Sequence, residues 1–208
     1  MLRPNLAMDA PPDFLRVGGA AYPIDVDFRT WLLIAEKSND LYIQINSPDD
    51  LLHNLSAICD MEARAFGGVL ESEDPYEALA AMTAFLRGYP EPPKGAAPEA
   101  RDAVYSFNYD LNYIILAIRN QSGIDLSFAR KEPFHWWRFL LEFRSLCGNH
   151  YILRMMDIRG YEADTGKDAH REALALKHLF ALPYEMNADE RRAAQEFDRM
   201  TEGEKNED

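Results

Sequence analysis

The sequence predicts a mainly α-helical protein, a multi-helix bundle of about seven helices with a short N-terminal β-hairpin. Three observations predict this fold class. Several segments carry apolar residues at i, i+3, i+4 and i+7, which is the pattern of an amphipathic helix. Ser, Asp and Pro stand where such segments begin, and glycine stands where they end. Strand signals occur in one place, around Gly18-Gly19.

The hairpin and the first helix adjoin each other. Residues 14–17 and 20–26 are predicted to be extended, because the glycine pair between them tolerates the positive φ angles of a tight turn. Asp27 then has the side chain of a helix cap. A stripe of apolar residues follows and predicts a helix over residues 28–45: Phe28, Trp31, Leu32 and Ala35.

Two further helices have clear start signals. Residues 47–50 (SPDD) combine a capping serine, a proline suited to the first helical position and two acids, and the helix should end near Gly67-Gly68. Residues 74–77 (DPYE) repeat this chemistry, with Glu77 placed to complete a capping box. That third helix should end by Gly88.

A proline-rich segment, residues 89–100, is predicted to be a linker or long exposed loop, because it holds four prolines, which remove backbone donors. It divides the chain into a first lobe, residues 13–88 with the hairpin, and a second helical lobe, residues 101–185, packed on the first. Residues 186–208 are expected to form a polar helix and an acidic tail.

The second lobe contains four predicted helices. One carries the stripe Leu111, Ile114, Ile115 and Ile118 and should end at Ser122-Gly123. The next spans residues 133–146. A shorter one runs from Asn149 toward Ile158, and another opens at Lys167 or Asp168 and runs toward Leu182. Asn187 with Glu190 starts the final polar helix.

Charge and composition exclude several classes of function. The chain has 208 residues and a formal net charge of -13, which repels polyanions, so we expect no nucleic-acid partner. No stretch approaches the roughly 20 apolar residues of a membrane span, and no apolar leader region is present, so we expect a soluble protein of the cell interior with no membrane partner. Cys59 and Cys147 lie far apart without zinc-ligand neighbours, and we expect both to be small buried hydrophobes.

The charge is unevenly distributed. Residues 36–80 carry ten acids and two bases, a net of -8, whereas residues 130–180 carry seven acids and nine bases, a net of +2. One interpretation is that these are solvated helix faces. The other is complementary docking, in which the acidic lobe meets the second lobe of its own chain or of a neighbouring subunit and high salt weakens the association.

The sequence shows no convincing catalytic, cofactor-binding or metal-ligating site. Asp25 and Asp27 have a spacing that binds divalent metals in some enzymes, but a helix cap explains Asp27 better. The five histidines lack metal-ligand spacing, and His135, between aromatic residues, is expected to be structural. We therefore predict that the protein is not an enzyme and needs no cofactor.

Aromatic residues are the remaining candidates for function. Tyr105, Phe107, Tyr109 and Tyr113 resemble a stacking platform, but interleaved Arg and Lys are missing and core packing explains them better. Trp136, Trp137 and Phe139 point to different sides of one helix, so at least one ring covers a second interface or meets a partner. The candidates for partner binding are Trp31, Tyr113, Trp136 and Trp137, with core packing as the alternative for each.

Three blocks of sequence together form a recognisable pattern. The blocks are residues 22–32 (YPIDVDFRTWL), residues 105–110 (YSFNYD) with Tyr113-Ile114 and residues 123–126 (GIDL), and residues 134–139 (FHWWRF) leading to Arg159-Gly160-Tyr161. In their order and spacing, which extend over residues 14–183, they resemble the bacteriophage protein fifteen family. The long proline linker and the polar helix after Pro183 depart from the family's pattern.

The resemblance implies a non-catalytic tail assembly chaperone of a long-tailed phage. Such a protein binds the tape-measure protein or other tail proteins in the cytoplasm of the bacterial host. Self-association into a homo-oligomer is a further expectation. The alternative is a structural tail-tip or tube-associated component retained in the virion tail, and an uncharacterised enzyme is a remote third.

Overall fold

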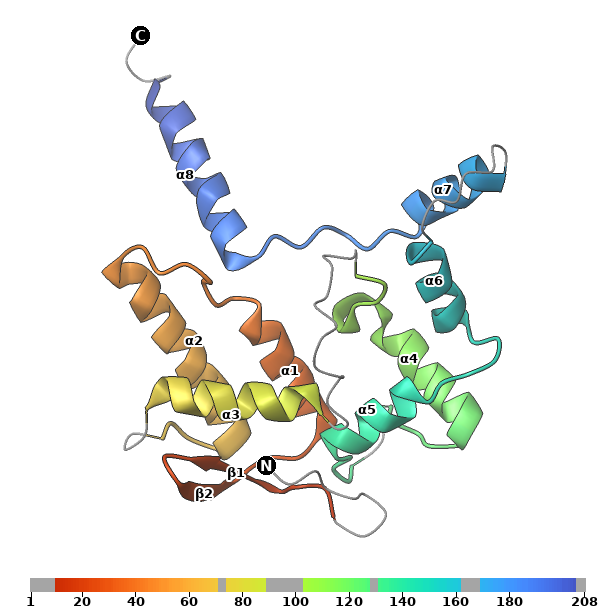
Figure 1. Ribbon diagram of the computed structural model, residues 1–208, viewed down its shortest axis with the longest axis horizontal. Helices are drawn as coiled ribbons and strands as arrows, with labels where there is room; N and C mark the ends of the chain where they lie inside the picture. The colour runs from red at the N-terminus through yellow and green to blue at the C-terminus, as the bar shows by residue number, and fades with distance from the viewer. Residues whose placement is uncertain (1–9, 71–73, 89–102, 128–130, 162–168, 205–208) are drawn as a thin grey trace. The chain divides into compact units, whose positions relative to one another are not determined.

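The computed structural model describes residues 10–70, 74–88, 103–127, 131–161 and 169–204. Within these ranges the chain forms eight helices and one two-stranded antiparallel hairpin, which confirms the predicted mainly α fold with an N-terminal hairpin (Figure 1). The predicted linker at residues 89–100 and the predicted helix start at Lys167 or Asp168 lie outside the described residues. None of the helices in the described ranges has the length and apolar character needed to cross a membrane.

The chain divides into two compact units. We call residues 88–183 the α4–α7 unit, and residues 12–87 together with 184–208 the hairpin unit. The hairpin unit is thus discontinuous in sequence, because its last helix follows the whole α4–α7 unit along the chain (Figure 1).

In the hairpin unit, β1 (Phe14–Val17) pairs with β2 (Ala20–Pro23). Gly18 and Gly19 form the predicted turn with φ angles of 57° and 88°, which side chains disfavour. The predicted extension of the second strand to residue 26 is wrong. Asp25 instead prepares the next helix, because its carboxylate accepts hydrogen bonds from the Asp27 amide at 2.8 Å and the Thr30 hydroxyl at 2.7 Å.

Helix α1 (Phe28–Ser38) begins as predicted, with the Asp27 carboxylate accepting a hydrogen bond from the Arg29 amide at 2.9 Å. The prediction that it runs to residue 45 is wrong. Asn54, from the following helix, accepts from the Tyr42 amide at 2.7 Å and donates to the Tyr42 carbonyl at 3.0 Å. These two bonds hold Tyr42 outside the helix, and local periodicity contains no sign of them.

Helices α2 (Pro48–Phe66) and α3 (Pro75–Arg87) agree closely with the prediction. Ser47 and Asp50 form a capping box at the start of α2, and Gly67 ends it with a φ angle of 77°. The capping box predicted for Glu77 is wrong, because its carboxylate instead accepts from the Gly18 amide at 3.1 Å and supports the hairpin turn.

The core of the hairpin unit forms where α3 packs against both β1 and α2. Figure 1 shows α3 between the hairpin and the α1–α2 pair. The Trp31 and Phe85 rings lie 4.2 Å apart, and the Trp31 Nε1–H donates to the Asp25 carbonyl at 2.6 Å. This indole therefore links α1 to α3 and to the end of the hairpin.

The α4–α7 unit contains α4 (Phe107–Ser122), α5 (Trp136–Arg144), α6 (Tyr151–Arg159) and α7 (Ala169–Leu179). Helix α4 packs on α5 and α6, and α6 packs on α7. The predicted helix over residues 133–146 is shorter, because the His135 Nδ1 accepts from the Trp137 amide at 3.0 Å and so caps it at residue 135.

The two cysteines are free and differ from the prediction. Cys59 is partly exposed and Cys147 is exposed, so the expectation that both are buried is wrong. Helix α5 ends at Arg144, so Cys147 lies outside the helix and does not continue its buried side chains. Its amide donates to the Gln121 side chain at 2.9 Å.

Helix α8 (Ala188–Glu204) starts at the residues that the sequence indicates. The Asn187 side chain accepts from the Glu190 amide, and the Glu190 carboxylate accepts from the Asn187 amide, both at 2.9 Å. This reciprocal pair is the predicted cap.

Candidate partner-binding surface

Helix α4 has one buried and one exposed apolar stripe. Ile114 and Ile118 are fully buried. On the other side, Tyr109, Tyr113 and Leu116 are 46%, 42% and 52% exposed. Their spacing of i, i+4 and i+7 places these three side chains on one face of the helix.

Helix α6 adds a fourth side chain to this surface. Tyr151 is the first residue of α6 and is 47% exposed. Its ring centroid lies 5.0 Å from that of Tyr113, at an interplanar angle of 52°. We call Tyr109, Tyr113, Leu116 and Tyr151 the aromatic face. Clustered exposed apolar side chains of this kind mark interaction surfaces.

A buried ion pair fixes α4 against α6 beneath the aromatic face. The Arg159 guanidinium donates to both carboxylate oxygens of Asp110, at 2.6 Å and 3.2 Å, and neither side chain is more than 8% exposed. The same guanidinium donates to the carbonyls of Val104 at 3.2 Å and Phe180 at 2.7 Å. The Ser106 amide also donates to Asp110, at 2.9 Å.

This pair is a positioning device more than a source of net stability. Desolvating two charges is costly, and the attraction between them roughly offsets that cost only when their other hydrogen bonds are satisfied, as they are here. Its consequence is geometric. The start of α4, the end of α6 and the residue that follows α7 are held together at Arg159.

The aromatic face is poor in negative charge. Asp110 is the one acidic residue of α4, and it is buried against Arg159. The exposed polar neighbours on α4 include Asn112 and Arg119, and Arg154 is exposed on α6 one turn after Tyr151. Asp157 is also exposed, one turn after Arg154 on α6, so in a chain of net charge -13 it is the α4 part of this surface that lacks exposed acidic side chains.

Of the four residues that the sequence singles out for partner binding, Tyr113 is the one on this surface. Trp31, Trp136 and Trp137 are 0%, 2% and 8% exposed. Trp136 lies among Phe107 and Phe139, with ring centroids 6.1 Å and 5.5 Å away. In this conformation the three tryptophans are core residues, although Trp136 and Trp137 leave α5 on different sides.

Sequence reasoning missed the rest of the aromatic face. Tyr109 and Leu116 are detectable in principle, because they repeat at helical spacing with Tyr113 on the side opposite Ile114 and Ile118. Tyr151 carries no such signal. Its place beside Tyr113 follows from the packing of α6 on α4.

The residues considered for metal or acid–base chemistry have structural roles. Asp25 and Asp27 accept hydrogen bonds at the start of α1, and His135 caps α5. Across the part of the chain that the structure describes, no group of three or more His, Cys, Asp or Glu side chains is arranged to hold a metal ion.

Comparison with known proteins identifies the family. A family model described as Bacteriophage Gp15 protein matches residues 9–182. Searches of curated proteins and of solved structures gave no significant match. The matched region includes the hairpin, the Asp110–Arg159 pair and the whole aromatic face, and it ends before α8. The match covers most of the length of the chain, and the chain therefore belongs to the Bacteriophage Gp15 protein family.

Proposed function

We propose that this phage protein is a tail assembly chaperone that binds the tape-measure protein through its aromatic face. The family is a phage family, and the resemblance of its motifs to tail assembly factors suggests the stage of phage growth. The observation that carries the proposal is the aromatic face itself, a cluster of large side chains that remain 42–52% exposed.

The chemistry of this face suits a helical partner. A tape-measure protein is a long helical chain whose apolar stripes need cover until the tail tube surrounds them. Tyrosine and leucine at helical spacing form a ridge against which such a stripe can pack, and the tyrosine hydroxyls can remain in water. Arg119 and Arg154 at its edge favour a stripe flanked by neutral or acidic residues.

The proposal is tested by co-expression of the chain with a tape-measure fragment, followed by size-exclusion chromatography. The wild-type chain is expected to elute with the fragment. Leu116→Asp places a charge in the aromatic face and should lower the affinity at least about tenfold. Leu52→Asp is the matched control, because Leu52 is a leucine on α2, outside the α4–α7 unit, and is 63% exposed.

Separate elution of the wild-type chain and the fragment at micromolar concentration contradicts the proposal. Equal effects of the two substitutions contradict the assignment of the aromatic face. Circular dichroism of both variants checks that the helices are retained, so that a loss of binding is not a loss of fold.

A second experiment separates the chaperone from a structural tail component. We propose that the protein acts in the host cytoplasm and leaves the assembly before completion. Mass spectrometry of purified phage particles should then find the tape-measure protein and not this chain. Its presence at stoichiometric amounts in particles would favour the structural role.

A further inference from the structure

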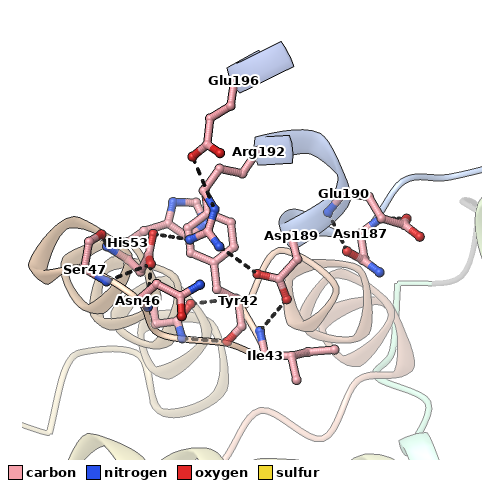
Figure 2. A network of polar contacts seen from close by, with 12 residues as sticks. Tyr42, Ile43, Asn46, Ser47, His53, Asn187, Asp189, Glu190, Arg192 and Glu196 are labelled. Carbon is pink, nitrogen blue, oxygen red and sulfur yellow. Dashed lines mark hydrogen bonds and ion pairs between the residues drawn. The ribbon is translucent and has the colours of Figure 1, made fainter. Parts of the chain in front are cut away.

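Helix α8 contacts the N-terminal part of the hairpin unit through residues that are about 150 positions apart in sequence. The Asp189 carboxylate accepts from the Ile43 amide at 3.0 Å, 146 residues away in sequence. The Arg191 guanidinium pairs with Asp40 at 2.8 Å, 151 residues away. Figure 2 shows Asp189 and Arg192 pointing from α8 toward the segment that carries Tyr42 and Asn46.

Arg192 is the central contact. Its guanidinium pairs with Asp50 at 2.5 Å, and the Asp50 side chain is only 6% exposed. The guanidinium carbon also lies 5.0 Å from the centroid of the Tyr42 ring, within the range of a cation–π contact. We call Asp40, Tyr42, Ile43 and Asp50 the arm receptor, and residues 184–204 the arm.

The described polar contacts between the arm and the arm receptor come from the first turns of α8. Ala188 is 2% exposed, but Gln195 and Glu196 are exposed and Phe197 is 66% exposed. Figure 1 accordingly shows α8 leaving the α1–α2 region at its first turns. Asp189 Oδ1 is buried without a hydrogen-bond partner, and it lies 3.7 Å from the Arg192 guanidinium as an ion pair. The described contacts that anchor the arm to the receptor are therefore mainly charged.

The arm receptor is supported without the arm. Asn54 bonds both backbone groups of Tyr42, and the His53 and Tyr42 rings stack at 4.4 Å. Asp50 accepts from the amides of Asn46 and Ser47 as part of the α2 capping box. None of these contacts comes from α8, so the receptor is expected to keep its shape when the arm leaves.

The connection to the arm is extended and exposed. Between the end of α7 and the start of α8, residues 181–187 form neither helix nor strand, and all but Leu182 are exposed. Such a connector places few restrictions on where the arm docks. The described contacts with the receptor are made by side chains of the arm, which are identical in every copy of the protein.

From these observations we propose that the arm receptor binds the arm of a second copy of this chain, so that copies exchange their C-terminal helices. In the exchanged form, Arg192 of one copy pairs with Asp50 of the other through the contacts seen within one chain. Exchange of an identical element is a low-cost route to dimers, since it creates the same interface in a different connection.

The direct test is a fluorescent peptide of residues 184–204 added to the full-length Arg192→Glu chain, whose own arm has lost its central contact. The peptide is expected to raise the anisotropy and to saturate. Wild-type chain should bind it at least about tenfold more weakly, because its own arm competes at a local concentration in the millimolar range.

Two further peptides make the test specific. The peptide with Arg192→Glu should bind at least about tenfold more weakly than the unmodified one, because it loses the pair with Asp50. The peptide with Arg199→Glu is the matched control, with the same change of charge at an exposed position on α8, and should bind like the unmodified peptide. No binding to the Arg192→Glu chain up to about 1 mM, or equal binding of both altered peptides, would overturn the proposal.

Sedimentation velocity of the unlabelled full-length chain tests the exchange itself. Between about 10 µM and 1 mM, a range that brackets the local concentration of a tethered arm, wild type and Arg199→Glu should form a species of twice the monomer mass. The Arg192→Glu chain should remain monomeric. A wild-type monomer at all concentrations, or a dimer that the Arg192→Glu chain also forms, contradicts arm exchange and leaves the proposed function of the aromatic face unaffected.

Discussion

Single residues with several partners determine much of this structure. Arg159 donates to a carboxylate and to two carbonyls that lie 55 and 21 positions away in sequence. Trp31 packs on Phe85 and donates to the Asp25 carbonyl. All of these residues except Val104, Phe180 and Phe85 belong to the motifs that carry the family resemblance. Many motif residues therefore serve the architecture.

Arg159→Met is expected to lower the free energy of unfolding by about 3–5 kcal/mol, because it leaves the Asp110 carboxylate buried without its cation. Urea denaturation measures the change. Arg154→Met on the same helix is the control, since Arg154 is exposed and should change stability by no more than about 0.5 kcal/mol. Similar losses for the two variants would show that the buried pair has no special role.

Trp31→Ala is expected to cost about 3–5 kcal/mol, because the side chain is fully buried. Trp31→Phe should cost less, since it keeps most of the ring volume and loses the hydrogen bond to Asp25. Thermal and urea unfolding give both values. An unchanged stability of the Ala variant, together with a loss of tape-measure binding, would instead assign Trp31 to the partner surface.

At the level of elements, the sequence predicts those helix boundaries that are set by residues next to them in the chain. Helix α2 is the clearest case, because a capping box, a proline and a terminal glycine all lie within or next to it. The end of α1 could not be predicted, because the Asn54 side chain that holds Tyr42 lies on another helix. On the aromatic face, Tyr113 is one of the candidates that the sequence names, with core packing as its alternative, whereas Tyr151 joins the face through helix packing.

Substitution of His135 tests what sets the start of α5. Its ring nitrogen accepts from the Trp137 amide, so His135→Ala should remove the cap of α5 and cost about 0.5–2 kcal/mol. His135→Asn keeps a side-chain acceptor and should cost much less. Chemical denaturation compares the two, and equal losses would show that the ring acts through packing and not as a cap.

Asp50 gives the docked arm a pH dependence. Hydrogen bonds from Arg192 and then from the Asn46 amide lower the pKa of Asp50 below its usual value. A carboxyl group with a lowered folded-state pKa contributes stability above its unfolded value, near 4, and loses it as the pH falls through the folded value. Wild type should therefore exceed Asp50→Asn in stability at pH 7, and the difference should disappear as the pH falls below about 4. A difference that persists in acid would assign the effect to packing.

At the scale of the whole molecule, the charge is unevenly distributed along the chain, with a net of -8 over residues 36–80 and +2 over residues 130–180. The chain is strongly acidic, yet α4, which carries three of the four residues of the aromatic face, has no exposed acidic side chain. A net negative charge of this size limits nonspecific self-association. On the proposed partner surface, a neutral or acidic protein therefore meets no exposed acidic side chain of α4.

This charge predicts a solubility minimum. The sequence pI is near 4.8, and proteins without net charge associate more readily. Turbidity of a concentrated sample should rise near that pH and be low at pH 7. A minimum near neutral pH would instead indicate that a local apolar surface, and not net charge, limits solubility.

The discontinuity of the hairpin unit has a consequence for the order of events during translation. The arm receptor is complete once α2 has left the ribosome, but the arm follows only after the α4–α7 unit. At about 5–20 residues per second, the roughly 120 residues between α2 and α8 take about 6–24 s to synthesise. During that interval a nascent chain presents an empty receptor to finished neighbours. Neighbouring ribosomes on one message would therefore give copies of this protein an early opportunity to exchange arms.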